Sequence, residues 1–184
     1  MNNYAGSKID NAWVQTYSGI RFNLFNPSLD DIRIEDIAHS LSNLARFNGH
    51  TAKFYSVAQH SVYCALKAPE RLALAALLHD ATEAYLGDIV SPLKSFLCDY
   101  LPFENRLYNL IAKKYLPVCL TVDDYKEISN IDLRMLATEK FQLMGYDLEW
   151  ESLKDISGYS ILIEYMSPNS AEKAFLACFK RFSI

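Results

Sequence analysis

The sequence lacks the disulfide and zinc-binding patterns that stabilise small proteins whose hydrophobic core is insufficient. Only four cysteines occur in 184 residues, and no C-x-x-C pair suggests a zinc ribbon or a disulfide framework. Glycine and proline are sparse, at six each, and no low-complexity tract, repeat or linker divides the chain. A chain of this length can bury a sizeable core, so we expect one domain over residues 1–184 and a functional role for any bound metal.

Further absences exclude two kinds of partner. No apolar run approaches the roughly 18 residues that a membrane helix needs, and the N-terminus, MNNYAGSKIDNAW, lacks the apolar core of an export signal. Positive charge is not in excess either, because the net charge is −4 and the pI is near 5.5. We therefore expect a cytoplasmic protein with reduced thiols, no membrane association and no duplex nucleic acid partner, whereas a small anionic ligand needs only a few local cations.

Hydrophobic residues recur with helical spacing through most of the chain. Residues 1–34 mix Gly, Asn, Asp and Pro with aromatics and predict an extended or hairpin segment, and apolar positions three and four apart follow from there onward. The expected fold is all-α, a bundle of about six or seven helices with a short N-terminal hairpin segment. The predicted helices fall at 34–47, 56–68, 69–87, 91–97, 103–116, 122–145 and 169–182.

One apolar helix ends in a histidine and several acids. The stretch ALLHDATEAYLGD places His79, Asp80 and Glu83 on one helix face or its flank if this helix continues to Gly87. An apolar helix does not bury such groups unpaired, because an uncompensated buried carboxylate changes its protonation state or meets a cation. A divalent metal ion is the simplest cation that satisfies the set.

Two more residues complete a ligand set. His60 lies on the apolar face of the preceding helix, and Asp132 lies on a late helix whose neighbouring Leu133, Leu136 and Ala137 are expected to face the core. Together with the histidine and aspartate of the HD pair, they make two imidazoles and two carboxylates, which suit Zn, Co, Mn, Fe or Ni. Each residue alone has a plainer explanation, as a hydrogen-bonded core histidine or a capping acid. The ordered set on apolar helices favours the metal site.

Several long strings of the sequence resemble the HD-domain metal-dependent phosphohydrolases, in particular the small bacterial and phage deoxynucleotide hydrolases. The resemblance runs from TYSGIRFN through ARFNGHTAKFYSVAQHS and ALLHDATEAYLGDIVSPLK to IDLRMLATEKFQLMG. It implies an HD-type helical fold in which the metal ligands are His60, His79, Asp80 and Asp132. An ion held there polarises a phosphoryl oxygen and lowers the pKa of water.

The resemblance also implies roles for residues around the ion. Glu83 and Asp88 are the acids that orient or deprotonate the attacking water, and burial beside other acids predicts a raised pKa for Glu83. Each substrate contact has a plainer alternative, as a helix-end cation, a surface lysine, or a packing or turn residue. The expected contacts are Arg46 and Lys94 at the phosphates, Phe47 at the base, Pro92 at the sugar and, because it follows a predicted turn, His50.

The expected activity is hydrolysis of 2′-deoxynucleotides by attack of water on the α-phosphorus. The favoured substrate is dATP, cleaved to deoxyadenosine and triphosphate, with dADP and dAMP as further substrates and additional Mg on the substrate phosphates. Gly49, close to Phe47, leaves the base preference open. Alternatives are a 5′-deoxynucleotidase acting on monophosphates, a hydrolase of another phosphoester such as an alarmone or cyclic dinucleotide, and a catalytically silent nucleotide-binding domain.

The sequence also leads to expectations about assembly and cellular setting. Aromatic residues in the first 25 positions and in KAFLACFKRF could form an interface, and the resembling proteins often assemble, so we expect a homo-oligomer. The same aromatics could instead serve an intramolecular core. If the protein is phage-encoded, its place of action is the host cytoplasm.

Overall fold

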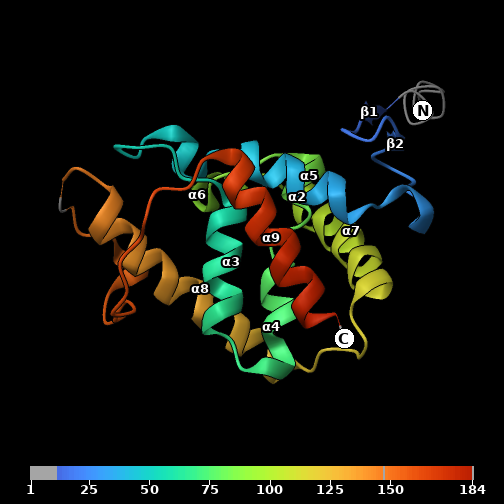
Figure 1. Ribbon diagram of the computed structural model, residues 1–184. Coiled ribbons are helices and arrows are strands. Elements are labelled where there is room, and N and C mark those ends of the chain that lie inside the picture. Colours follow the sequence, from blue (N-terminus) through green and yellow to red (C-terminus); the bar gives the residue numbers. More distant parts are fainter. Residues whose placement is uncertain (1–11, 147, 184) are drawn as a thin grey trace.

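Helices dominate the computed structural model, which describes residues 12–146 and 148–183 (Figure 1). Short 3-10 turns occur at Leu29–Asp31, Arg46–Gly49 and Glu151–Leu153. The all-α expectation is confirmed for the described residues. The α-helices are α2 (Ile34–Asn43), α3 (Val57–Lys67), α4 (Glu70–Leu77), α5 (Glu83–Leu86), α6 (Ser91–Lys94), α7 (Tyr100–Tyr115), α8 (Val122–Leu143) and α9 (Pro168–Phe182).

The N-terminal segment contains the expected hairpin. Strands β1 (Trp13–Gln15) and β2 (Arg21–Asn23) pair antiparallel, and Gly19 between them has φ +83, a conformation that favours glycine. A two-stranded hairpin is marginally stable on its own, so it needs an anchor. Phe22 provides one, because it is fully buried and stacks on Tyr85. The first eleven residues of the predicted segment lie outside the described part of the chain.

The main core lies between α2, α3, α4 and α9. In Figure 1, α9 runs alongside α3 and α4, and its Phe175 is fully buried among apolar residues of these helices. Ile37, Leu41 and Leu77 are also fully buried, and burying one such side chain contributes about 1.5–3 kcal/mol. This packing holds α3 and α4 rigidly side by side, which fixes the relative positions of the residues they carry.

Helix α8 packs on α3 and α4 through a smaller apolar contact. Its buried residues include Ile131 and Met135, which lie against Cys64 and Ala76. Leu133, Leu136 and Ala137 are only half-buried, so the expectation that they face the core is wrong. The inward face of α8 is instead the one that carries Ile131 and Met135, which pack against Ala76 of α4 and Cys64 of α3.

The helix predicted over 69–87 is wrong in its second half. Helix α4 ends at Leu77, residues 78–82 form a turn, and α5 begins only at Glu83. In a continuing helix the carbonyl oxygen of Ala76 would accept the backbone N–H of Asp80. Instead it accepts a hydrogen bond from Nδ1 of His79 at 2.8 Å, and this competing bond from a side chain accompanies the break.

Other helix boundaries differ by smaller amounts. The helices predicted at 34–47 and 91–97 end early, at Asn43 and Lys94, and the one predicted at 103–116 begins at Tyr100. Among the described residues, no helix is both long and apolar enough to span a membrane.

Candidate metal centre

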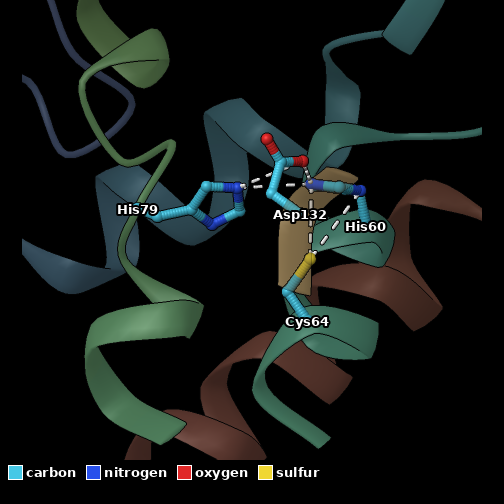
Figure 2. A group of neighbouring side chains, drawn as sticks. All are labelled: His60, Cys64, His79 and Asp132. Atoms are coloured by element: carbon cyan, nitrogen blue, oxygen red, sulfur yellow. Dashed lines mark hydrogen bonds and ion pairs between the residues drawn. The ribbon is translucent and has the colours of Figure 1, made fainter. Parts of the chain in front are cut away.

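Three separate elements bring the predicted ligands together. His60 lies in the first half of α3, His79 lies in the turn after α4, and Asp132 lies in the middle of α8 (Figure 2). Asp80 follows His79 in the same turn. The His60 side chain is fully buried, whereas those of His79, Asp80 and Asp132 are 12%, 20% and 36% exposed. The group is therefore anchored in the core at one end and open to solvent at the other.

The donor atoms of these four side chains are spaced as ligands of one ion are. Nε2 of His60 lies 3.3 Å from Nε2 of His79 and 3.1 Å from Oδ1 of Asp132. Oδ2 of Asp80 lies 3.2 Å from Nε2 of His79 and 3.7 Å from Nε2 of His60, and the distance from His79 Nε2 to Asp132 Oδ1 is 3.8 Å. Tetrahedral ligands at ordinary Zn distances are about 3.4 Å apart. The residues fit a divalent ion.

Cys64 brings a sulfur atom into the same group. The donor atoms of His60, Cys64, His79 and Asp132 all lie within 4.8 Å of one another, so these four side chains could hold a metal ion. The sulfur is 3.4 Å from Nε2 and 4.0 Å from Nδ1 of His60. Because these two distances are similar, Cys64 lies beside the imidazole ring and not beyond Nε2, where the lone pair points. Asp80 therefore stays the expected fourth ligand.

Acidic neighbours control the protonation of the two imidazoles. Burial lowers the pKa of His79, but the carboxylates of Asp80 and Asp132 outweigh it and raise this pKa to about 10. Burial also lowers the pKa of His60, yet the net direction is again upward because of nearby acidic groups, including Glu139. Burial raises the pKa of Asp132, whereas hydrogen bonds from both imidazoles hold it well below its usual range. An ion that binds through Nε2 must displace these protons.

We expect Zn²⁺ binding to release protons and to strengthen as pH rises. Neighbouring acids raise the pKa of both imidazoles, so an ion displaces protons from them, and each proton displaced weakens binding by up to about tenfold for each unit by which the pH falls below that group's pKa. Calorimetric titrations of Zn²⁺ into metal-stripped protein at pH 6 to 8, in buffers of different ionisation enthalpy, count the protons. His39→Gln is the control, because His39 pairs with Glu172 away from the centre. Binding without proton release would contradict ligation by His60 and His79.

Glu83 is a buried carboxyl with one free oxygen. Its Oε1 lies 3.6 Å from Nζ of Lys94, and its Oε2 is buried without a hydrogen-bond partner. Burial raises the pKa of Glu83 to about 9, and the negative charges of Asp80 and Asp88 act in the same direction. The raised pKa agrees with the direction predicted from the sequence. A carboxyl whose pKa lies near the working pH can both accept and donate a proton.

Asp88 and Lys94 lie in the same charged group. Asp88 is half-buried, and burial raises its pKa although Arg46 opposes the shift. The Lys94 amine lies 2.9 Å from Oε1 of Glu104, a residue of α7, and it also faces Glu83. A phosphate that binds Lys94 therefore competes with Glu104 for the amine.

A strained turn places Arg46 at the edge of the ligand group. Phe47, Asn48 and Gly49 have φ values of 55, 50 and +76, and left-handed backbone is uncommon for residues other than glycine. The Arg46 backbone N–H donates to the carbonyl oxygen of Tyr55 at 2.9 Å, which ties the turn to the start of α3. Such strain persists where the surrounding structure fixes it, and it is frequent at functional sites.

The predicted substrate contacts lie at different distances from this centre. Nη1 of Arg46 lies 3.5 Å from Oδ2 of Asp80, and the guanidinium carbon is 5.4 Å from the centre of the Phe47 ring. His50, at the end of the turn, and Pro92, in the first turn of α6, are exposed. No hydrogen bond or ion pair joins either to the ligands within the described part of the chain. Their roles stay predictions.

Sequence reasoning missed Glu139. This residue is fully buried, and its carboxylate lies 2.5 Å from Nδ1 of His60 and accepts a hydrogen bond from the Tyr55 hydroxyl at 2.8 Å. The available signal was its spacing, because Glu139 follows Asp132 by seven residues, which is about two helical turns and places both on one side of α8. Tyr55 lies just before α3 and carried no signal of its own.

The fold and the site define an all-α protein with a candidate divalent-metal centre. No family model matches the chain. It is similar to the protein YfdR of Escherichia coli K12, with 46% identity over 133 residues that cover 72% of each chain. It is also similar to a protein of Rhodobacter capsulatus, with 38% identity over 146 residues that cover 73% of this chain and 74% of the other. The chain therefore belongs to the family of YfdR.

Both relatives are named as uncharacterized proteins, so their names suggest no activity.

Proposed function

We propose that this protein is an HD-domain metal-dependent phosphohydrolase that cleaves 2′-deoxynucleotides, with dATP as the favoured substrate. One observation carries the proposal: two imidazoles and two carboxylates from three elements meet at ligand spacing beside a buried acid of raised pKa. Metal-dependent phosphoester hydrolysis uses a Lewis acid, a group that takes the proton of water, and cations for the phosphate oxygens. The site offers residues for each task.

His60, His79, Asp80 and Asp132 are the residues that would hold the ion. Zn, Co, Mn, Fe or Ni suits this mixture of nitrogen and oxygen donors, and such an ion polarises a phosphoryl oxygen and acidifies water at the site. The fully buried His60 and the more exposed Asp132 leave an approach for substrate on one side only.

Glu83 supports the proton transfer that the reaction requires. Its free Oε2 is available to accept a proton from the attacking water once the carboxyl is ionised. The pKa of about 9 depends partly on the charge of Asp80, so it falls toward neutral when a cation neutralises Asp80. In the proposed reaction water oxygen bonds to the α-phosphorus, the bond from phosphorus to the 5′ oxygen breaks, and Glu83 passes the proton to that oxygen.

Lys94 and Arg46 support the binding of a phosphate chain. Lys94 lies between Glu83 and Glu104, and a triphosphate supplies more negative charge than Glu104 alone, which favours transfer of the amine to the substrate. The proposed choice of triphosphate rests on the SPLK segment and its likeness to the phage enzymes. Cleavage of monophosphates by the same centre is the second candidate.

The proposal is tested by a substrate panel. Protein loaded with one defined metal is incubated with equimolar ribo- and deoxynucleoside mono-, di- and triphosphates, and the products are separated by chromatography. We expect deoxyadenosine and triphosphate from dATP, and loss of both products in Asp132→Ala, which removes one ligand. Cleavage mainly of deoxynucleoside monophosphates would instead indicate a 5′-deoxynucleotidase. No turnover with Mn, Co, Zn or Mg would contradict the proposal.

A further inference from the structure

A hydrogen-bonded network of buried groups lies behind His60, on the side away from Nε2. Glu139 is its centre, and both of its carboxylate oxygens have partners. Oε1 lies 2.5 Å from Nδ1 of His60 and accepts from the hydroxyl of Tyr55 at 2.8 Å. Oε2 accepts from Arg46, with Nε at 3.2 Å and Nη2 at 3.1 Å. Tyr55, His60 and Glu139 are all buried, so this network is shielded from water.

Burying a carboxylate this completely requires compensation. An ionised carboxyl away from water is costly unless it is paired and hydrogen-bonded. Arg46 supplies a fork of two donors to one oxygen, and Tyr55 and His60 satisfy the other. The Arg46 guanidinium, which is always charged, pairs with this carboxylate, and every contact of its two oxygens is with a donor. Glu139 therefore acts only as a hydrogen-bond acceptor.

An anionic acceptor at Nδ1 determines how the His60 ring can be used. Nδ1 must carry the proton in its bond to Glu139, so Nε2 is the nitrogen left to bind an ion. Nε2 is also the atom that lies 3.1 Å from Asp132 and 3.3 Å from His79. The hydrogen bond thus selects both the tautomer and the orientation that the ligand set requires.

Arg46 connects this network to a second ligand. Its Nη1 lies 3.5 Å from Oδ2 of Asp80 while Nε and Nη2 hold Glu139, and its side chain is only 12% exposed. A rigid guanidinium can span two carboxylates in this way, whereas a lysine ammonium is a single point charge. The structure thus shows Arg46 engaged with the centre itself.

We propose that Glu139 is the positioning residue of the metal centre: it holds His60 with Nε2 toward the ion, and Arg46 couples it to Asp80. The inference rests on the proposed function, because it assumes an ion at the four ligands. It also gives Arg46 a role in organising the ligands in addition to the expected contact with phosphate.

The test measures Zn²⁺ affinity without nucleotide, by competition with a chromophoric chelator. We expect Glu139→Gln to weaken binding about 10- to 100-fold and Tyr55→Phe to weaken it less. The matched control is Glu172→Gln, which removes a carboxylate that pairs with a different imidazole, that of His39 at 3.1 Å, and should bind as the parent does. Circular dichroism melts show which variants are folded.

A second measurement separates positioning from a general structural effect. In the Zn²⁺-loaded parent, the Nδ1 proton of His60 should give a strongly downfield proton NMR signal, which disappears in Glu139→Gln and shifts in Tyr55→Phe. A folded Glu139→Gln with parental Zn²⁺ affinity and an unmoved signal overturns the inference. If Glu139→Gln does not fold, Tyr55→Phe decides: parental affinity together with an unmoved signal overturns it equally.

Failure of this inference and failure of the proposed function give different results. A parent that binds Zn²⁺ tightly but cleaves no nucleotide overturns the proposed function. The positioning role of Glu139 is then still decided by the Zn²⁺ affinity of Glu139→Gln. A parent that binds no Zn²⁺ overturns both.

Discussion

Replacing Glu83 by glutamine is expected to reduce the turnover of dATP by about 10²- to 10⁴-fold while preserving the fold and Zn²⁺ binding. An amide of the same shape cannot accept a proton from water, and Glu83 is not one of the four ligands. The measurement compares kcat at pH 8 with fully loaded protein. Turnover of Glu83→Gln at the parental rate would show that another group takes the proton.

The same substitution is expected to stabilise the protein at alkaline pH. Burial raises the folded-state pKa of Glu83 from 4.5 to about 9, so between these values the folded state holds a proton that the unfolded state has lost. The parent therefore loses stability as pH rises through this window, by up to about 1.4 kcal/mol per pH unit, and the glutamine variant does not.

Urea unfolding in the presence of a chelator at pH 5, 7 and 9 measures this difference. The free energy of unfolding of Glu83→Gln should match the parent at pH 5 and exceed it increasingly toward pH 9. Glu172→Gln, at a partly exposed position, controls for general effects of charge. A difference that stays constant from pH 5 to 9 would mean that Glu83 is not protonated in the folded protein. The expected gain in stability of Glu83→Gln would show that Glu83 lowers the stability of the parent, as is common for residues that serve catalysis.

Loss of one ligand is expected to have the second large effect. His79→Ala and Asp80→Asn should each weaken Zn²⁺ binding by more than about a hundredfold and bring turnover to background. The expected loss is larger than for a residue that only hydrogen-bonds a ligand, where about a hundredfold is the upper range. An ion present at 100 to 1,000 times its Kd stabilises the folded state by about 2.7 to 4.1 kcal/mol. Thermal melts with and without Zn²⁺ should therefore show a shift in the parent and none in these variants.

Cys64→Ser is the matched variant that identifies the fourth ligand. Because the Cys64 sulfur lies beside the His60 ring, its replacement should leave the Zn²⁺-dependent shift nearly intact. If Cys64→Ser loses the shift and Asp80→Asn retains it, the sulfur is the ligand. Co²⁺-loaded protein gives an independent readout, since a thiolate ligand adds an intense near-ultraviolet band that the parent should lack.

Several parts of the site were accessible from the sequence because they depend on local pattern. The apolar faces of α3 and α8 are visible in the spacing of their residues, so His60 and Asp132 could be identified as polar groups on apolar helices. The adjacent His79 and Asp80 could be identified as candidate ligands from the sequence alone. The sequence could not show that His79 lies in a turn, because that break depends on a hydrogen bond between its ring and the Ala76 carbonyl.

The surroundings of the ligands were less accessible. Glu139 resembles any other acid of an amphipathic helix, and its partners Arg46 and Tyr55 come from positions 93 and 84 residues away. Its burial follows from the way α8 packs on α3, and a local pattern cannot express that packing. For the same reason the engagement of Lys94 with Glu104 has no counterpart in the sequence.

The helical class, the N-terminal hairpin and four candidate ligands could be predicted from the sequence, because hydrophobic period and the chemistry of side chains are properties of short segments. It takes the tertiary structure to show that the two imidazoles lie within 3.1 to 3.8 Å of each other and of both carboxylates, that the Cys64 sulfur lies beside the His60 ring, and that Glu139 contacts Nδ1 of His60. These are distances between helices, and packing of α3, α4, α8 and α9 against one another sets them.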